Sequence, residues 1–470
     1  MTCLRKGRIG RLEGAVYVIT GEEKRVPLTK VEIKTETKLA RITEKVKEAP
    51  GFKFTSLMHL MNEEYLKGCY RELKKNKAAG IDGRQVEDYS DEEIDCAISE
   101  TVEKMKGKRY RPKPVRRVYI RKENGKERAL GIPTVIDKVI QQGMLKIMEA
   151  IYEPIFMENS YGFRRGRDQH ECVKELNHII MQKKVNWIID ADIKGFFDNV
   201  DHHWMITCLE QKIGDPNFKR MVIRFLKAGV MEAGKLEKTA QGTPQGGIIS
   251  PILGNIYLHY VLDLWFEKKE KQAITGEAHL IRYADDFVIG VQTKRDAEQI
   301  LNDIRNRLAE FGLSVSEEKT SIKEFGRFAA RNSTMRGEGK PKTFDFLGFT
   351  HYCTTTRDGR FQVKVKTSRK KLNKAITGMN EWLKKNRNRI TIVEIWRMLK
   401  LKLRGHYNYY GLSGNFESIQ RYYQRTRSLV FKWMNRRSQK KTWNWESFDK
   451  YLERYELPKP RITYAIYNTW

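Results

Sequence analysis

Apolar residues recur at two different spacings along the chain, and these spacings separate helical regions from extended ones. Between residues 54 and 77 they return every three or four positions and stop at the Gly-Ile-Asp-Gly of residues 80–83, which predicts a helix that leads into a glycine-rich turn. Residues 112–120 and 128–133 have the pattern of strands, and Glu-Asn-Gly-Lys at 123–126 supplies a turn between them. We therefore expect a β-hairpin with basic side chains on both arms.

The centre of the chain predicts apolar strands that carry carboxylates. Residues 187–193 (Trp-Ile-Ile-Asp-Ala-Asp-Ile) place acids at alternating positions, and a second strand at 279–283 meets Ala-Asp-Asp before the pattern resumes at 287–290. Acids in such strands are costly unless they have a partner. Between the two strands, Gln-Gly-Thr-Pro-Gln-Gly-Gly at 241–247 predicts a loop whose glycines permit close backbone approach, followed by a helix from Ser250.

The two ends of the chain differ from this centre. Residues 1–50 are basic and mixed in pattern, with a helical stretch at 38–47, and we expect an extension that is partly disordered when alone. Beyond residue 367 the pattern is helical and strongly basic, with tryptophan and tyrosine between the charges. The spacing of Trp396 and Leu399 predicts that these two side chains pack in a helical core.

The composition indicates a globular protein with a polyanionic partner. The 470 residues are 40% hydrophobic, which is enough to bury a substantial core in about two to four domains. Lysine and arginine number 90 against 59 acidic residues, which gives a net charge of +31. Nucleic acid is the commonest partner of so basic a protein. A membrane surface fits less well, because no basic helix has a clean apolar face and the charges are spread along the chain.

The cysteines and the apolar runs define the expected compartment. The six cysteines are widely separated and include no Cys-x-x-Cys pair, so a zinc or redox centre is not indicated and structural thiols in a reducing cytoplasm are. No apolar segment of a signal peptide follows the first residues, and no run of about 18 apolar residues occurs. We therefore expect a soluble, cytoplasmic protein of bacterial type, associated with RNA or the nucleoid.

Three aspartates provide the most specific chemical signal. Transfer of a nucleotidyl group to a 3′-hydroxyl uses two metal ions roughly 3.5–4 Å apart, and magnesium prefers oxygen ligands such as aspartate. Asp192 and the adjacent Asp285 and Asp286 would converge if their two strands were neighbours. Taken alone, Asp285-Asp286 also fits an ordinary polar hairpin turn, but the strongly apolar flanks and the third acid on a similar strand favour a metal site.

These motifs, taken in order, resemble a known family. Tyr-Ala-Asp-Asp at 283–286 is similar to the signature tetrad of reverse transcriptases, and it is preceded in the same order by residues 192–198 and 243–247. The likeness covers roughly residues 55–435 and is greatest to the reverse transcriptase/maturase proteins encoded by group II introns. Those proteins also show, at comparable places, Gly-Ile-Asp-Gly (80–83), Tyr-Gly-Phe-Arg (161–164) and Phe-Leu-Gly-Phe (346–349).

The resemblance implies an α+β fold of the right-hand polymerase type, with an antiparallel palm sheet and a basic helical thumb. The expected parts are a basic N-terminal extension (1–54), fingers (55–185), a palm carrying the aspartates (186–350, with a fingers insertion near 205–240), a connection (351–366), thumb/maturase helices (367–435) and a short C-terminal nucleic-acid-binding remnant (436–470). Many relatives carry a C-terminal His-Asn-His endonuclease with cysteine pairs. None follows Trp443, so we expect an endonuclease-lacking type without second-strand DNA cleavage.

The resemblance also assigns catalytic and metal-binding residues. Asp192, Asp285 and Asp286 match the triad that binds two Mg²⁺ ions, for which Mn²⁺ can substitute, and the backbone carbonyl of Ile193 is a further expected ligand. Lys319 falls where a polymerase lysine protonates the leaving pyrophosphate. An exposed lysine without a catalytic role is the alternative there.

The expected nucleotide-binding residues lie on three segments. Phe197 stands where an aromatic ring stacks under the sugar and excludes a ribose 2′-hydroxyl, with core packing as the alternative. Lys122 and Arg128 resemble the residues that clamp the triphosphate, with a solvated basic turn as the alternative. Gln245 and Gly246 resemble the loop that packs on the template base and the incoming nucleotide, where glycine allows the backbone to approach a base.

A segment at 161–167 combines aromatics, glycines and arginines. That composition suits contact with template phosphates and stacked bases, so Tyr161, Phe163, Arg164 and Arg165 are expected to bind the template. For Tyr161 and Phe163, packing between fingers and palm is an equally good interpretation.

By this resemblance we expect an RNA-directed DNA polymerase, a nucleotidyltransferase, that also binds its host group II intron RNA to assist splicing and retrotransposition. Its partners would be an RNA template with a DNA or RNA primer, deoxynucleoside triphosphates, intron RNA and target DNA, with no membrane. Two alternatives stay open, namely a reverse transcriptase of the same fold in bacterial defence and an RNA-binding splicing scaffold without polymerase activity. The intact aspartates argue against the scaffold, because clustered acids have no use in a protein that only binds a polyanion.

Overall fold

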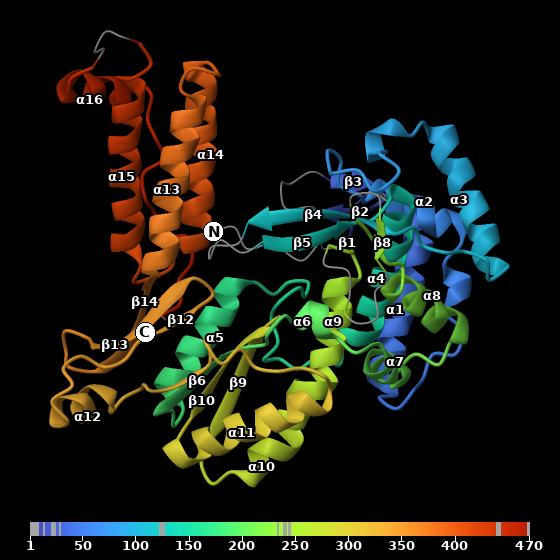
Figure 1. The fold of residues 1–470 in the computed structure, drawn as a ribbon, viewed down its shortest axis with the longest axis horizontal. Coiled ribbons are helices and arrows are strands. Elements are labelled where there is room, and N and C mark those ends of the chain that lie inside the picture. The colour runs from blue at the N-terminus through green and yellow to red at the C-terminus, as the bar shows by residue number, and fades with distance from the viewer. Residues whose placement is uncertain are drawn as a thin grey trace.

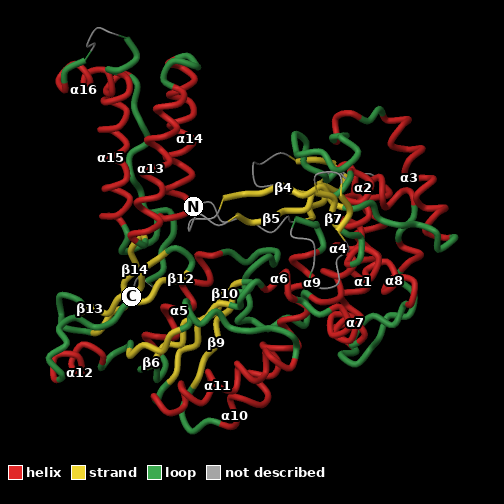
Figure 2. The backbone as a smooth tube through the Cα atoms, in the orientation of Figure 1, coloured by secondary structure: helices red, strands yellow, loops and turns green. Residues whose placement is uncertain are grey.

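The computed structural model describes residues 9–12, 15–19, 25–27, 30–121, 127–232, 235–237, 242, 246–438 and 443–467. Side chains are described from residue 36 onward, apart from those of 121 and 235–237. This part of the chain has an α+β fold with four separate sheets. Figures 1 and 2 show two helical bodies on opposite sides of the molecule and a sheet with its own helices between and below them.

The N-terminal segment carries three short strands and a long helix. Strands β1 (Ile9–Leu12), β2 (Ala15–Ile19) and β3 (Arg25–Pro27) form a small antiparallel sheet. Helix α1 (Lys30–Glu48) follows, so the helix predicted at 38–47 is confirmed and begins earlier than expected.

The first helical body shares one large apolar core with the central sheet. Its elements are η1 (Met58–Leu60), α2 (Glu63–Arg71), η2 (Val86–Asp88), α3 (Asp91–Lys106), α4 (Val135–Tyr152), α7 (His202–Glu210) and α8 (Pro216–Leu226). The continuous helix predicted across 54–77 is wrong in length, because α2 begins only after Asn62. The Asn62 side chain accepts a hydrogen bond from the Tyr65 backbone N–H (3.0 Å) and thereby caps the helix at this point.

A four-stranded sheet extends from this body toward the C-terminal helices (Figure 1). Its order is β5-β4-β7-β8. Strands β4 (Val115–Arg121) and β5 (Glu127–Ile132) form the predicted antiparallel hairpin, and β4 pairs in parallel with β7 (Val230–Glu232), which in turn pairs with β8 (Lys235–Glu237). The hairpin turn, with Lys122, lies outside the described residues.

The central sheet is antiparallel and has the order β11-β6-β10-β9. Its strands are β6 (Trp187–Asp192), β9 (Ala278–Tyr283), β10 (Asp286–Val291) and β11 (Ser321–Glu324). Both carboxylate-bearing strands predicted from the sequence are therefore confirmed, and β10 pairs with each of its two neighbours, β6 and β9.

Helices cover this sheet and close its core. They are α5 (Gln169–Gln182), the short α6 (Phe196–Asn199), α9 (Ser250–Leu258) with its continuation through the π-helical turns η3 (His259–Asp263) and η4 (Phe266–Glu270), α10 (Lys271–Ala273) and α11 (Lys294–Glu310). The helix predicted from Ser250 is confirmed. Helix α5 contacts β9, and α11 contacts β6, β10 and η3.

A small sheet leads from this region to the C-terminal helices. It contains β12 (Phe344–Phe346), β13 (Phe349–Thr355) and β14 (Phe361–Thr367), with α12 (Ala329–Met335) against β13.

The C-terminal helices have a core of their own. The basic C-terminal region forms α13 (Arg369–Asn386), α14 (Ile392–Tyr410), α15 (Phe416–Met434) and α16 (Trp445–Arg454). Trp396 and Leu399 are buried in this core, as predicted. None of the described helices combines the length and the apolar character needed to cross a lipid bilayer.

Candidate active site

Three aspartates lie together at one end of the central sheet. Asp192 is the last residue of β6 and stands directly opposite Asp286, the first residue of β10, in the antiparallel register. Asp285 precedes Asp286 in the short turn that joins β9 to β10. The fold thus brings the three acids that the sequence singled out to one edge.

The turn between β9 and β10 has an uncommon backbone conformation. Ala284 has a φ of +58°, a region that residues with side chains rarely adopt. A neighbouring segment packs tightly against this residue, since a Cβ atom on Gly162 would lie 2.4 Å from the Ala284 nitrogen. Only glycine fits there. We call residues 283–286 the aspartate turn.

Burial and mutual repulsion govern the charge of these acids. The pKa of Asp286 is raised to about 8 by burial, by a hydrogen bond with Asp192 and by the charge of Asp285. Burial also raises the pKa of Asp285, and the positive charge of Arg128 opposes that rise. Carboxylates crowded in this way remain ionised more readily when cations are close.

Two lysines pair with acids on β6. Lys319 Nζ forms an ion pair with Asp192 Oδ2, and Lys323 Nζ lies 3.3 Å from Asp190 Oδ2. Burial opposes the charge of Lys319, but its contact with Asp192 raises the pKa of the ammonium. Lys319 is held in place through Ser316, whose N–H donates to Asp192 O (2.7 Å) and whose carbonyl accepts from the Lys319 N–H (3.0 Å).

The chemistry of this donor set fits divalent cations. Hard carboxylate oxygens are the ligands that magnesium and manganese prefer, and the repulsion that raises the pKa of Asp286 is relieved by a bound cation. Ile193 follows Asp192 with its side chain buried, so its backbone carbonyl is the group through which it would contact an ion. Within the described residues, no three His, Cys, Asp or Glu side chains already converge as the ligands of one ion do.

Two phenylalanines follow β6 on the short helix α6. Phe196 is buried, whereas part of the Phe197 ring stays accessible. Their rings are 5.0 Å apart and meet edge to face. A Cβ on Gly254 of α9 would lie 2.9 Å from Phe196 Cε1 and 3.2 Å from Phe197 Cε1, so α9 packs closely on both rings. Phe196 is the core residue of the pair, as the sequence favoured.

The glycines of the predicted loop bring separate backbones together. Gly242 has a φ of +82°, and a Cβ there would lie 2.7 Å from Phe197 O. Gly246 has a φ of +109°, and a Cβ there would lie 2.6 Å from Gly131 O on β5. The described part of the loop therefore joins the Phe197 segment to the β4–β5 hairpin through contacts that side chains would block.

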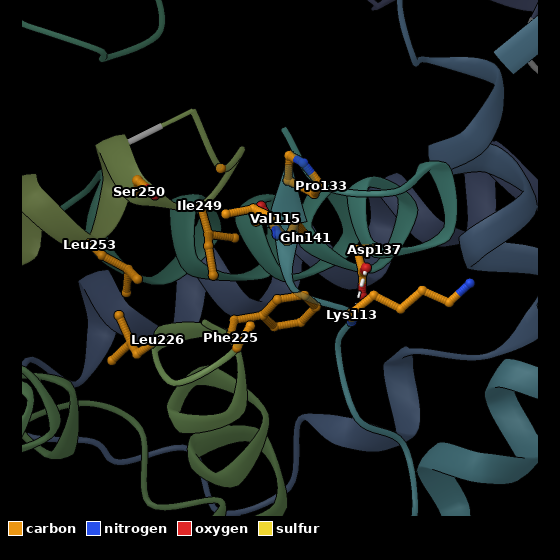
Figure 3. Close-up of a pocket in the computed structure, with 12 residues that line it drawn as sticks. Lys113, Val115, Pro133, Asp137, Gln141, Phe225, Leu226, Ile249, Ser250 and Leu253 are labelled. Atoms are coloured by element: carbon orange, nitrogen blue, oxygen red, sulfur yellow. Dashed lines mark hydrogen bonds between the residues drawn. The ribbon is translucent and has the colours of Figure 1, made fainter. Parts of the chain in front are cut away.

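The end of this loop is anchored on α4. The Ile248 N–H donates to Gln141 Oε1 (2.7 Å). Figure 3 shows Gln141 and Ile249 at a mainly apolar pocket, with Phe225 of α8 below them. Gln245, which the sequence assigns to nucleotide binding, lies outside the described residues.

The residues expected to bind the template divide into two pairs. Tyr161 and Arg164 are buried, and Arg164 pairs with Glu153 (2.9 Å). Phe163 is 57% exposed and has a φ of +57°, while Arg165 is exposed in an ion pair with an acid of α4. The surroundings of Tyr161 and Arg164 favour packing, and Phe163 and Arg165 are the two that solvent reaches.

Sequence reasoning missed a buried ion pair beside the aspartates. Arg282 on β9 and Asp263 on η3 are completely buried and lie 2.6 Å apart between Nη2 and Oδ2. The available signal was an arginine inside the otherwise apolar strand at 279–283, since a charge in such a strand requires a partner.

Comparison with known proteins identifies the family. The family described as reverse transcriptase (RNA-dependent DNA polymerase) matches residues 120–351, which include the three aspartates. The group II intron-encoded protein LtrA of Lactococcus lactis subsp. cremoris is 32% identical over 459 residues, covering 81% of this chain and 74% of LtrA. The chain belongs to the group II intron-encoded reverse transcriptases. The suspected resemblance is thereby confirmed.

More distant similarities of this group II intron-encoded reverse transcriptase include two further intron proteins. The COX1/OXI3 intron 1 protein of Saccharomyces cerevisiae is 26% identical over 391 residues (66% of this chain, 44% of that protein). Nuclear intron maturase 4 of Arabidopsis thaliana is 24% identical over 240 residues (49% and 28%). Membership of the family makes the protein an RNA-directed DNA polymerase that assists intron splicing, with nucleic acids as partners. Reverse transcriptases generally use divalent metal ions.

Proposed function

We propose that this reverse transcriptase performs nucleotidyl transfer with two Mg²⁺ ions at Asp192, Asp285 and Asp286, and that Mn²⁺ can replace them. The supporting observation is the cross-strand pairing of Asp192 with Asp286, next to Asp285, in surroundings that raise the pKa of Asp286 to about 8. When bound, the ions would activate the primer hydroxyl and neutralise charge on the triphosphate. The carbonyl of Ile193 would supply a further oxygen.

The surrounding side chains would bind and orient the incoming nucleotide. Phe197 lies five residues after Asp192, stays partly accessible and would exclude a ribose 2′-hydroxyl. The positive charge of Arg128 acts on the pKa of Asp285, and Arg128 would bind the triphosphate together with Lys122. Gln245 and Gly246 would pack on the base pair that forms.

Lys319 is proposed to supply a proton to the leaving pyrophosphate. Its pairing with Asp192 places the ammonium at the aspartates, and the raised pKa keeps it protonated at neutral pH. A protonated group at this position can donate as the leaving oxygen gains charge.

The arrangement of elements supports a right-hand polymerase. We propose that residues 55–185, together with an insertion near 205–240, act as fingers and that the rest of residues 186–350 acts as palm. Residues 367–435 would form the thumb and maturase domain, 351–366 the connection, 1–54 a basic extension and 436–470 a short nucleic-acid-binding remnant. An RNA template with its primer would contact Phe163 and Arg165, and intron RNA and target DNA would bind basic surfaces of the same protein. A cytoplasmic location remains a prediction.

Primer extension on an RNA template with deoxynucleotides and Mg²⁺ tests the metal site. Asp285→Ala should lower the rate by roughly 10³-fold, because a metal ion supplies several kcal/mol to the transition state. RNA binding by the variant, measured at the same salt concentration, should not fall. Equal extension by wild type and variant would contradict the proposal.

A further inference from the structure

The buried pair of Arg282 and Asp263 lies directly beneath the aspartate turn. Arg282 Nε donates to Asp263 Oδ1 (2.7 Å) and Nη2 donates to Oδ2 (2.6 Å), which is the two-bond geometry that guanidinium and carboxylate groups favour. Both side chains are fully excluded from solvent. Burial of two charges is costly even when they are paired, and an apolar pair of similar volume is often as stable. Stability alone therefore gives no reason for an ion pair at this place.

Arg282 also reaches the aspartate turn itself. Its Nη1 donates to the carbonyl oxygen of Ala284 (2.9 Å) and to Asn255 Oδ1 (3.2 Å), and its Nη2 donates to Ser160 Oγ (2.7 Å). Ala284 is the residue with a φ of +58° that immediately precedes Asp285. A strained backbone conformation persists only where its surroundings hold it, and the bond from Arg282 holds the carbonyl of this residue.

A second contact holds the same residue from its nitrogen side. Asn255 Nδ2 donates to Gly162 O (2.8 Å), and Gly162 packs so closely on Ala284 that a Cβ would lie 2.4 Å from its nitrogen. Arg282 and Gly162 are thus linked through Asn255. Together they enclose Ala284 between two fixed groups.

The helix that carries Asp263 departs from regular α-helical geometry at this residue. Asp263 is the last residue of the π-helical turn η3, which continues α9. π-helical turns are rare and occur often at functional sites. Helix α11 packs against η3, so Asp263 lies within the packed core.

We infer that the Arg282–Asp263 pair is a positioning device that fixes the aspartate turn for metal binding. Asp263 orients the guanidinium, the guanidinium holds the Ala284 carbonyl, and Ala284 sets the direction in which Asp285 and Asp286 leave the turn. Because both side chains are fully buried, the pair would act through the aspartate turn and not by contact with a nucleotide. This inference rests on the proposed metal site at the aspartates.

A double variant separates positioning from stability. Arg282→Met combined with Asp263→Leu replaces the ion pair by apolar side chains of similar size, which often preserves stability, but removes the donor to Ala284. Arg282→Lys provides a second variant, because lysine keeps the charge opposite Asp263 but lacks the fork of donors that serves the other acceptors. It keeps the test decisive if the double variant does not fold.

A matched control lies at the opposite end of the same β9–β10 hairpin. Asp296 is buried and accepts hydrogen bonds from Gly276 N (3.0 Å), Thr275 N (3.2 Å) and Thr293 Oγ1 (2.7 Å), all remote from the aspartate turn. Asp296→Ala removes a buried carboxylate with a similar number of bonds. It should lower the melting temperature without altering metal affinity.

The measurements are Mn²⁺ affinity by electron paramagnetic resonance, primer extension and the melting temperature. The double variant and Arg282→Lys should bind Mn²⁺ about 10- to 100-fold more weakly than wild type, as expected when groups that orient metal ligands are lost. Excess Mn²⁺ should restore part of their extension rate. Asp285→Asn serves as the reference for loss of the site.

Each outcome has a distinct meaning. Weak Mn²⁺ binding by a folded double variant, with normal binding by Asp296→Ala, supports the positioning role. Wild-type Mn²⁺ affinity and extension in the double variant or in Arg282→Lys overturn that role while Asp285→Asn still loses binding. Equal Mn²⁺ affinity of wild type and Asp285→Asn overturns the proposed metal site, and this inference with it.

Discussion

His351 is a buried histidine stacked on an aromatic ring. It is completely buried on β13, and neither ring nitrogen has a hydrogen-bond partner among the described residues. Its ring stacks on Phe344 with centroids 4.7 Å apart and planes 4° apart. Burial lowers the pKa of His351 to about 3, so the folded protein keeps this side chain neutral.

This histidine should make stability depend on pH. The unfolded chain protonates it near its ordinary pKa of about 6.5, whereas the folded protein resists protonation until about pH 3. His351 therefore does not change the free energy of unfolding above pH 7. As the pH drops below about 6.5 it lowers this free energy, by about 2 kcal/mol at pH 5. Denaturant unfolding at pH 7.5 and 5.0 should show a smaller loss for His351→Phe than for wild type. An equal loss in both proteins would show that another group is responsible.

A second residue-level prediction concerns Phe197 and the choice of sugar. Phe197→Ala should increase the use of ribonucleotides relative to deoxynucleotides by about 100-fold, since a difference of one methylene group in a pocket already changes discrimination by roughly 10- to 200-fold. Single-nucleotide incorporation with each substrate measures the ratio of kcat/KM values. Extension with deoxynucleotides on the same preparation reports whether the variant is intact. An unchanged ratio would indicate that the ring only packs beside Phe196.

The sequence predicted the acids at this scale better than it predicted their neighbours. Asp192, Asp285 and Asp286 were found because acids interrupt apolar strands, and Phe196 was correctly placed in the core. The partners of these residues were not found. Arg282 meets Asp263, and Lys323 meets Asp190, across distances in sequence that only the strand register and helix packing determine.

At the scale of elements, the glycine-rich loop depends on contacts between backbones. Gly246→Ala combines a φ of +109° with a Cβ 2.6 Å from Gly131 O, so the loop must shift away from the hairpin. The backbone conformation alone costs about 1–3 kcal/mol. We expect the KM for deoxynucleotides to rise about tenfold or more, measured by steady-state extension.

Gly83→Ala is the control for this prediction. Gly83 also has a positive φ of +73°, but no atom lies within 4 Å of a Cβ there. The Gly83→Ala variant should have a strained backbone without displacing a neighbouring group, and its KM for deoxynucleotides should stay at the wild-type value. A similar rise in KM for both variants would assign the effect to general destabilisation.

Periodicity predicted the types of the elements well and their limits less well. The strands at the aspartates and the helix from Ser250 were confirmed because apolar runs and turn residues bound them clearly. The helix expected across 54–77 failed, because apolar residues of the preceding loop continue the helical spacing. Leu57 and Leu60 are buried without belonging to α2. Periodicity of apolar residues does not take account of a polar capping residue such as Asn62, which marks where the helix begins.

At the scale of the whole molecule, the charge of +31 predicts salt-sensitive RNA binding. Each lost phosphate contact should lower the slope of log affinity against log salt concentration by about 0.7–0.9. Lys384 and Lys385 are exposed in the last turn of α13. If the C-terminal helices bind RNA, replacing Lys384 and Lys385 by alanine should reduce the slope by roughly the amount expected for the loss of two phosphate contacts.

The control removes the same charge elsewhere. Lys104 and Lys106 on α3 are exposed, but they pair with Glu100 (3.0 Å) and Glu103 (2.7 Å). Filter binding at several salt concentrations should show a smaller change in slope after their replacement by alanine. Equal changes for both pairs would mean that the C-terminal helices are no preferred surface for RNA.

The mutual placement of the parts could not be read from the sequence. Composition and pattern indicated several units, but not that the first helical body shares its core with the central sheet while the C-terminal helices do not. That difference arises from long-range packing, such as Phe156 of the first body against His259 of η3, 5.5 Å between ring centroids. Periodicity within a segment contains no information about which partner covers it.

The separate core of the C-terminal helices marks a place where related enzymes could be recombined. A small apolar cluster of Val173, Phe349, Val365, Leu412 and Ile466 joins these helices to the rest of the described chain. Ring contacts of Tyr409 with His170 and Phe349, and of Tyr410 with Phe349, add to this junction. A chimaera that crosses over near residue 367 would therefore have to preserve only the side-chain contacts between these helices and the rest of the chain. If the C-terminal helices bind RNA, the copying machinery of one protein could in this way be combined with the RNA preference of another, and selection could change the two properties independently.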